Sequence, residues 1–543
     1  MYQVLLFIIL FISCSPLDLT EQCFHFPEKI ICHFENEDFG TFENNSKYKI
    51  GDFTTQTNEH AFKGKFGLKL DSNNIYGGTI KLKAKAGDIL KIKIKRLIKS
   101  QSSLVLSISG GKYTSVNKGK KINDKWEELE INSTVYSKEK QPILTIYTYY
   151  NKRDLKPTYF DELEIEIFGR DDTIKHPTIN NSIYLNIKPK DFEKIKSSRN
   201  KAFTTGIIEN ELKFWVPIIV NFNGETIKGK YKIKGDWTEH LETDKWGAKL
   251  KLNKAIFKTK KFSIMKPNSR SGLREVLFHE ILKENKILTT NYQLEGVIIN
   301  GTSKGYFAIE EHFSKAYLKK RGLPIGPIVK IEEQELWKAR NKSYYSNIFK
   351  EESKIDYHLI EDIKNYVKTN KNDEHRAIKL LEDFRNGSSQ LDSIFDVNYL
   401  TTFYALANIY QAHHSLIWHN MRFYYNPKQG KLYPIGYDNY SHNNFLIRSG
   451  YIGDKLEDFR NGWSSLFLKN PIFLKLYKQK LVQFSSKVFI DASIKKHKLI
   501  IDSALTKIQK ENCSYQEDFK FIYKNANAIH TSLNKKLNEL KSI

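Results

Sequence analysis

Two polar residues, Asn420 and Asp438, stand at the two ends of a segment with the pattern of a β-hairpin. Residues 422–425 and 431–435 are rich in aromatic and aliphatic side chains, and a turn containing Asn, Pro and Gly separates them. Because such a turn brings the bases of its strands together, we expect the Asn420 amide oxygen and the Asp438 carboxylate to lie close. Hard oxygen ligands of this kind suit Mg²⁺. The alternative role for Asp438 is to cap a turn before Asn439.

Three lysines upstream of this segment carry the charge that a phosphate-binding site requires. Lys249 and Lys251 alternate with apolar residues, which predicts a strand on which both side chains share one face. Lys234 lies on an earlier predicted strand. Since phosphoryl transfer needs cations on the phosphates, we expect one of these lysines to contact a nucleotide. The alternative for each is a solvated position on its strand.

A helix is predicted over 273–285, because apolar residues recur there at helical spacing. Glu280 lies on this apolar stripe, between Val276/Leu277 and Ile281, where an unpaired carboxylate would be energetically expensive. A carboxylate on a helix packed against the sheet can orient a phosphate-binding lysine. Glu280 is therefore the preferred partner of such a lysine. Glu275 is the second candidate, although it follows Arg274 directly and could form a surface ion pair with it.

The sequence before the hairpin offers histidines in place of an acidic base. Between Val397 and Tyr437 there is no Asp or Glu, whereas His413 and His414 are adjacent. A histidine can accept a proton near neutral pH, so His414 is the candidate base, acting beside Asp438. The alternative is that both histidines lie at the edge of the core. The chain would then bind nucleotide without transferring phosphate.

These residues belong to a series of segments that follow one another along the C-terminal two-thirds of the chain. The segments are 232–237, 245–252, 262–267, 274–280, 299–301, 305–313, 326–330, 419–427 and 434–438. Together they resemble the CotH-type (spore coat protein H-like) atypical protein kinases. The resemblance implies a bilobal kinase-like domain that uses ATP with Mg²⁺ or Mn²⁺ and phosphorylates Ser-rich proteins. CotH-type sequences usually have an acidic residue near the hairpin, so its absence leaves an inactive binding or scaffold protein as the alternative.

The elements that position these residues fall into two parts with different periodicity. Short alternating runs separated by Gly, Asn and Asp predict an antiparallel, jelly-roll-like β-sandwich over 24–168. Residues 169–181 indicate a linker. The kinase-like domain then spans 182–543, with a β-rich lobe at 182–331 and a helical lobe at 357–543. We therefore predict an α+β chain with a ligand-binding cleft between the lobes.

The sandwich segment also resembles the jelly rolls of carbohydrate-binding modules. The resemblance lies in Phe34–Asn36, 60–70, Trp126 and 159–163. In that family the opening acid and the closing Asp often share a structural Ca²⁺, and Glu35 and Asp161 are the matching positions. The resemblance implies a glycan as a partner. For the two acids, surface positions beside strand ends are the alternative.

Residues 1–14 indicate export. The apolar run from Val4 to Ile12 is too short to span a bilayer and has the length of a signal-peptide core. The sequence Phe11-Ile12-Ser13-Cys14 resembles a lipobox, in which the cysteine is acylated. We expect a lipoprotein of the cell envelope or cell surface, anchored to the membrane through Cys14. Plain secretion is the alternative.

The formal charge of the chain is +25, from 87 Lys and Arg against 62 Asp and Glu. The lysines are scattered along predicted strands and helices and form no single run, so we expect a solvated surface and no nucleic-acid partner. Together with the export signal, the resemblance to CotH-type kinases implies an extracytoplasmic protein kinase that transfers phosphate from ATP to Ser-rich proteins. The alternative is a catalytically inactive kinase-like scaffold whose sandwich recognises glycan.

Overall fold

The computed structural model describes residues 28–35, 50–51, 55–168, 182–337 and 361–541. Within these ranges the residues not described are 72, 83, 85–87, 99–102, 109–113, 117, 136–142, 150–156, 388–389, 442–449, 454–461 and 513–514. The predicted signal peptide with Cys14 and the linker at 169–181 lie outside the described residues, so both stay predictions. None of the described helices has the length and hydropathy needed to cross a membrane.

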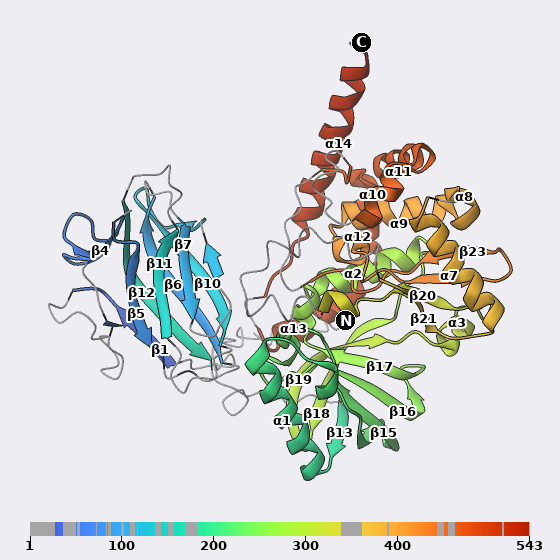
Figure 1. Ribbon diagram of the computed structural model, residues 1–543, viewed down its shortest axis with the longest axis horizontal. Coiled ribbons are helices and arrows are strands. Elements are labelled where there is room, and N and C mark those ends of the chain that lie inside the picture. The colour runs from blue at the N-terminus through green and yellow to red at the C-terminus, as the bar shows by residue number, and fades with distance from the viewer. Residues whose placement is uncertain are drawn as a thin grey trace, which may run out of the picture.

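Two antiparallel β-sheets form the N-terminal part of the chain, at the left of Figure 1. The larger sheet, in the order β3-β4-β12-β6-β10-β9 with β1 also paired to β12, consists of β1 (Glu28–Cys32), β3 (Gln56–Thr57), β4 (Gly67–Leu70), β6 (Ile89–Leu97), β9 (Lys120–Lys121), β10 (Trp126–Thr134) and β12 (Thr158–Phe168). The smaller sheet, in the order β2-β5-β11-β7-β8, consists of β2 (Ile50–Gly51), β5 (Tyr76–Lys81), β7 (Ser103–Ile108), β8 (Thr114–Val116) and β11 (Ile143–Tyr149). The predicted antiparallel sandwich is confirmed.

Strand β6 shows why this sequence forms a sandwich. Leu90, Ile92 and Ile94 alternate with lysines and are buried in the core between the sheets. The lysines therefore point outward, as the period of two requires. Because β6 lies between β10 and β12, each outward side chain has a cross-strand neighbour on both sides.

The second part begins with a closed barrel in the order β13-β14-β15-β16-β17-β19-β18. Its strands are β13 (Ile183–Ile187), β14 (Val216–Phe222), β15 (Glu225–Ile233), β16 (Ala248–Ile256), β17 (Thr259–Met265), β18 (Tyr292–Ile299) and β19 (Thr302–Glu311). Neighbouring strands are antiparallel except β13 and β18, which are parallel. The barrel encloses its own core of alternating apolar residues, and α1 (Pro189–Thr205) packs apolar side chains into it. The strand-rich segment predicted from the sequence therefore forms a closed barrel. The alternation of apolar and polar residues did not predict this closure.

The remainder is mostly helical. Its helices are α2 (Leu273–Glu284), α3 (Lys315–Lys320), α7 (Lys371–Arg385), α8 (Leu391–Ile394), α9 (Val397–Ile409), α10 (Gly462–Leu468), α11 (Pro471–Phe484), α12 (Lys487–Lys496), α13 (Lys498–Gln509) and α14 (Lys520–Lys541). A small sheet, β21-β20-β22-β23, is built from β20 (Ile328–Ile331), β21 (Ile363–Val367), β22 (Phe423–Asn426) and β23 (Lys431–Pro434). The α+β class with a β-rich and then a helical region is confirmed.

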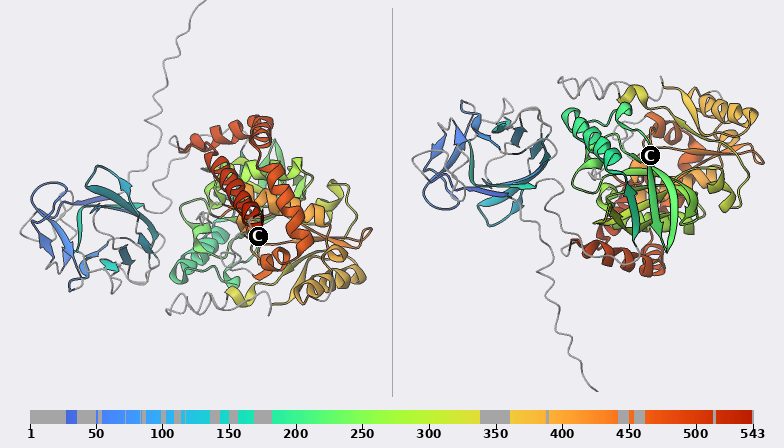
Figure 2. Two further views of the ribbon diagram at one scale, coloured as in Figure 1. Left: turned by 90° about the horizontal axis from the view of Figure 1, so that it is seen from above. Right: turned by 90° about the horizontal axis from the view of Figure 1, so that it is seen from below.

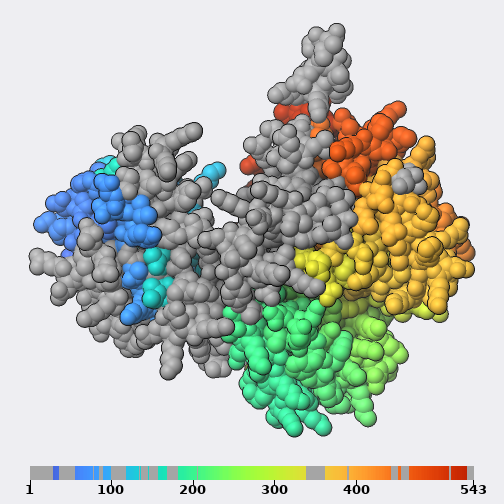
Figure 3. All heavy atoms as spheres, viewed as in Figure 1, coloured from blue at the N-terminus to red at the C-terminus, as the bar shows by residue number. Residues whose placement is uncertain are grey.

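Two elements connect the barrel to the helical region. Helix α2, predicted at 273–285, buries Val276, Leu277 and Ile281 in the same cluster as helices such as α9. Strand β20 falls within the predicted β-rich lobe but pairs with β21 and β22. In Figures 1 and 2 the barrel and the helical region lie against each other, with the sandwich beside them. Figure 3 shows the barrel atoms in green below the helical region.

Candidate active site between barrel and helices

The hairpin formed by β22 and β23 has Asn420 before its first strand and Asp438 after its second, as predicted. Both residues contact His414, which lies on the short 3₁₀ helix His413–Leu416. Asn420 Nδ2 is 3.1 Å from His414 Nε2, and Asp438 Oδ1 is 3.4 Å from His414 Nδ1. The hairpin and this helical turn therefore bring three predicted site residues together.

The tautomer of His414 follows from its partners. Its Nδ1 lies 2.8 Å from the backbone oxygen of Asp438. A carbonyl oxygen accepts hydrogen bonds and cannot donate them, so Nδ1 carries a proton and Nε2 holds the lone pair in the neutral ring. Burial alone would lower the pKa of His414, but the Asp438 carboxylate outweighs burial and raises that pKa above its ordinary value.

Asp438 is held in place by Arg270, which precedes α2. Arg270 Nε donates to Asp438 Oδ1 over 2.8 Å. Burial would raise the pKa of Asp438, but Arg270 and then His414 hold that pKa far below its usual range. Asp438 also has a φ of 54°, a left-handed conformation that non-glycine residues adopt at an energetic cost.

Glu275 fixes the backbone that follows Asp438. Its carboxylate is fully buried and accepts hydrogen bonds from Asn439 Nδ2 at 3.0 Å and from Tyr440 N at 3.1 Å. His279, one turn further along α2, contacts the same carboxylate at 2.9 Å. Glu275 therefore positions the Asp438 segment. It contacts neither Lys234 nor Lys249, contrary to its expected role beside a lysine.

The preferred carboxylate partner, Glu280, does not contact a strand lysine either. Its side chain is 15% exposed and accepts a hydrogen bond from Lys283 of the same helix at 2.6 Å. The expected pairing was wrong because the apolar stripe of α2 passes beside Glu280 and does not include it. The buried carboxylate next to a predicted lysine is Glu310 of β19, 3.5 Å from Lys234 Nζ.

Glu310 and Arg270 are the site residues that sequence reasoning missed. Glu310 is fully buried and binds both Arg270 and Lys234. The signal was available, because Glu310 continues an apolar strand where a carboxylate needs a partner. Burial and the nearby Arg270 lower the pKa of Lys234 to about 8, while Glu310 acts in the opposite direction.

Lys249 differs from these paired groups. Among the described residues it forms no ion pair and no side-chain hydrogen bond. Burial has the largest effect on Lys249 and lowers its pKa. Asp236 has the next largest effect and raises that pKa, while Lys213, Lys330 and Arg422 each lower it. Cations from the barrel and from the hairpin region therefore meet around Lys249.

Of two further cations, Arg422 belongs to the cluster around Lys249 and Lys251 lies outside it. Arg422, next to the hairpin, is buried, and its Nε has no hydrogen-bond partner. Lys251 shares a face of β16 with Lys249, as predicted, but it is exposed and two residues farther along the strand. The structure thus brings Lys234 and Lys249 to the site and leaves Lys251 outside it.

Glu35 and Asp161 of the sandwich both hold the loop at 62–66. Asp161 Oδ2 accepts from the backbone N of Phe62 at 2.7 Å, and Glu35 Oε1 accepts from the backbone N of Lys65 and of Phe66, each at 2.8 Å. Burial raises the pKa of Asp161 to about 6. Because backbone donors occupy an oxygen of each acid, the two carboxylates anchor this loop.

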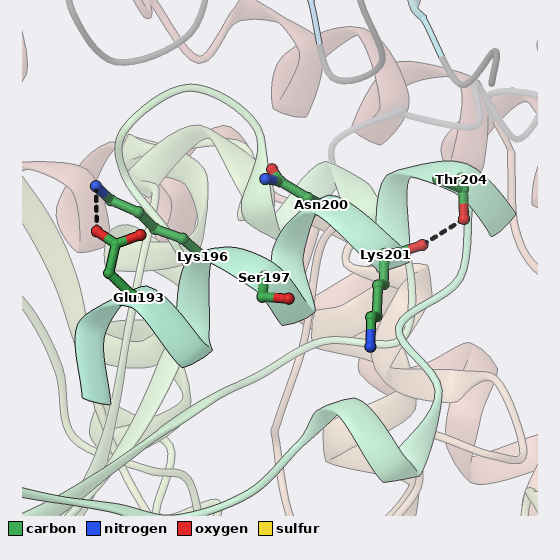
Figure 4. A pocket seen from close by; sticks show the side chains of 6 residues that line it. All are labelled: Glu193, Lys196, Ser197, Asn200, Lys201 and Thr204. Atoms are coloured by element: carbon green, nitrogen blue, oxygen red, sulfur yellow. Dashed lines mark hydrogen bonds and ion pairs between the residues drawn. The ribbon is translucent and has the colours of Figure 1, made fainter. Parts of the chain in front are cut away.

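A shallow hollow lies elsewhere, on the outer face of α1 (Figure 4). It is lined by Glu193, Lys196, Ser197, Asn200, Lys201 and Thr204. Lys196 pairs with Glu193 at 3.0 Å, and Thr204 donates to the backbone oxygen of Lys201 at 2.8 Å. None of the predicted site residues lines this hollow.

Comparison with known proteins found two solved structures of low similarity and one protein family. The N-terminal CBM22-1-CBM22-2 tandem domain of Paenibacillus barcinonensis Xyn10C is 14% identical, with 44% of this chain matching 64% of that structure at a TM-score of 0.20. A family 35 carbohydrate binding module from Clostridium thermocellum is 13% identical, with 25% of this chain matching 90% of that structure at a TM-score of 0.14. No curated protein matches the chain. Residues 233–542, more than half of the sequence, match the family described as CotH kinase protein, and the chain belongs to that family.

Proposed function

We propose that this protein is an extracytoplasmic CotH-type kinase that transfers phosphate from ATP, held with Mg²⁺ or Mn²⁺, to Ser-rich protein substrates. The observation that carries the proposal is Lys249, a largely buried cation that forms no ion pair among the described residues and feels only the more distant charge of Asp236 against three neighbouring cations. Burying an unpaired charge is costly, so such a residue is retained where an anion will neutralise it. A nucleotide phosphate supplies that charge.

The cations around Lys249 support phosphate as the anion. Lys330 and Arg422 both act on the charge of Lys249, and Arg422 has a buried N–H without a partner. A phosphate group offers several acceptor oxygens to such donors at once. The acids near these cations are already paired, because Asp236 binds Lys213 at 2.8 Å and Glu333 binds Lys330 at 2.7 Å.

The residues that would hold the divalent ion are Asn420 and Asp438. Among the described residues nothing donates a hydrogen bond to Asn420 Oδ1 or Asp438 Oδ2, and both side chains contact the same imidazole. These oxygens fit a hard cation. When bound, the ion would neutralise charge on the phosphates. Arg270 keeps Asp438 ionised and orients it.

His414 is the group that can accept the proton of a substrate hydroxyl. Its Nδ1–H is fixed by the backbone oxygen of Asp438, which leaves Nε2 as the basic atom. The Asn420 amide nitrogen lies 3.1 Å from Nε2, so a substrate hydroxyl would have to take the place of this amide. The carboxylate of Asp438 raises the pKa of His414 and so makes it a stronger base than a free histidine. This arrangement supports transfer even though no acidic residue lies between 397 and 437.

The test is transfer of labelled phosphate from ATP to Ser-rich peptides by the exported chain with Mg²⁺ or Mn²⁺. We expect His414→Ala to keep ATP affinity and to lose about 10²–10⁴-fold in turnover. His375→Ala, a change at an exposed histidine on α7, is the matched control. Equal turnover in wild type and His414→Ala would show that His414 is not the catalytic base.

A second function, nucleotide binding without transfer, is favoured by one specific observation. Asp438 Oδ1 is bound by Arg270 and also lies beside His414, so part of its ligand capacity is already used. In that case the chain would act as a lipid-anchored binding or scaffold protein, with glycan recognition by the sandwich. An ATP-dependent rise in melting temperature without phosphate transfer under either ion would select this second function.

A further inference from the structure

The outer face of the barrel contains lysines that face other lysines across neighbouring strands. Lys230 of β15 stands opposite Lys251 of β16, which in turn stands opposite Lys261 of β17. In the adjacent row Lys232 stands opposite Lys249. Like charges directly opposite each other destabilise a sheet. The barrel therefore keeps an arrangement that costs it stability.

Among the described residues no acidic side chain forms an ion pair with these lysines. Lys228, Lys230, Lys251 and Lys261 are exposed and take part in no ion pair. Lys232 lies over the ring of Trp215 at 4.9 Å. Burial lowers the pKa of Lys232, and so do Lys249 and Lys213. We call Lys228, Lys230, Lys232, Lys251 and Lys261 the lysine strip.

The acids nearest to the strip in sequence pair with other lysines. Glu225 accepts from Lys254 at 2.6 Å, and Asp236 accepts from Lys213 at 2.8 Å. The strip is thus a continuous patch of positive charge across three strands. Its spacing is regular, since alternate residues on a strand lie about 6.8 Å apart and neighbouring strands about 4.8 Å apart.

The strip leads to the proposed active site. The row that contains Lys232 and Lys249 continues through Ser263 to Glu310, which is fully buried beside Arg270. Exposure falls along this row, from the part-exposed Lys232 to the buried Ser263 and Glu310. A polyanion lying on the strip would therefore have one end next to Lys249, where the phosphates are expected.

We propose that the lysine strip docks an acidic segment of the protein substrate, rich in Asp, Glu or phosphoserine, in an extended conformation. This rests on the proposed kinase function. Charge complementarity supplies the attraction, and alternate side chains of an extended peptide have the same repeat as alternate lysines of β15. Single-stranded nucleic acid would use aromatic rings for stacking. The ring beside the strip, Trp215, is 41% exposed with Lys232 Nζ over it at 4.9 Å, so an oligonucleotide is the competitor that the experiment must separate from an acidic peptide.

The experiment measures fluorescence anisotropy of labelled peptides on the exported chain without nucleotide. One peptide has a serine flanked by glutamates, and a second has glutamines in their place. We expect the acidic peptide to bind more tightly, and its binding to weaken with added salt. In the double variant Lys230→Glu, Lys251→Glu that affinity falls by about tenfold or more. Lys254→Glu, on the same strand but off the strip, keeps the wild-type affinity.

Several results would overturn the proposal. These are equal affinity for the two peptides, equal loss in Lys254→Glu, or tighter strip-dependent binding of anionic vesicles or of an oligonucleotide. A melting curve of the double variant excludes unfolding as the cause of lost binding. If the wild-type chain binds the acidic peptide but transfers no phosphate, only the proposed kinase function is contradicted. If it transfers phosphate without preferring the acidic peptide, only the proposed role of the lysine strip is contradicted.

Discussion

The sandwich and the barrel contain strands with the same alternation of lysine and apolar residues, yet they treat the charge in opposite ways. In the sandwich Lys93 faces Glu130 on one side and Glu164 on the other, and Lys95 faces Glu128. In the barrel Lys251 faces lysines on both sides. The lysines of the sandwich strand β6 are therefore neutralised by glutamates on the neighbouring strands. Lys249 and Lys251 of the barrel strand β16 face no such partners, and this is where we propose that an anionic ligand binds.

The largest expected difference comes from making one kind of substitution in both regions. Arg96 of the sandwich is 4% exposed and bound to Glu127. Arg96→Met should lower the free energy of unfolding of the sandwich by about 3–5 kcal/mol, because the mostly buried Glu127 carboxylate loses its cation and keeps the hydrogen bond from the backbone N of Gly119. Lys249→Met should cost nothing or stabilise the barrel. Denaturant unfolding, monitored by hydrogen exchange in each region, measures both changes in stability. Equal losses of stability in the two variants would contradict the proposed difference between sandwich and barrel.

The pH dependence of the free energy of unfolding tests whether burying the charged form of Lys234 destabilises the folded state. Its pKa of about 8 lies below the ordinary value of 10.5, so the folded state binds fewer protons than the unfolded state between these values. The free energy of unfolding should therefore rise with pH in this window, by at most about 1.4 kcal/mol per pH unit from this group. Below pH 8 the cost is present in full. Lys234→Met should remove this slope, and an unchanged slope would contradict the assignment.

Charge reversal should give smaller effects of opposite sign in the two regions. Lys251→Glu places a carboxylate between Lys230 and Lys261 and should stabilise the barrel by about 0.2–1 kcal/mol for each pair. Glu128→Lys in the sandwich should destabilise it by a similar amount, since it faces Lys95. The measurement is the denaturant midpoint at low salt. A loss of stability in Lys251→Glu would mean that its neighbours do not repel each other.

The sequence was sufficient for elements whose signal is local. The alternation of apolar residues predicted the sandwich, the spacing on α2 predicted that helix, and the turn between 425 and 431 predicted the hairpin that joins Asn420 to Asp438. Each of these depends on residues close together in the chain. The order of the site segments was also enough to indicate the CotH family.

What the sequence could not supply was the register between strands. Whether a lysine faces glutamate or lysine depends on pairing set by the whole sheet, so the lysines of β15 and β16 seemed scattered and solvated. Barrel closure has the same origin, because the parallel pairing of β13 with β18 joins residues far apart in sequence. For the same reason Glu310 was missed as the partner of Arg270.

The ATP-induced change in melting temperature with Mg²⁺ tests most directly whether Lys249, a cation without an ion pair, binds a nucleotide phosphate. We expect a rise for the wild-type chain, a rise of the same size for Lys254→Met, and little or none for Lys249→Met. Lys254 lies on the same strand but already pairs with Glu225. Equal rises in all three proteins, or no rise in wild type, would contradict this role of Lys249.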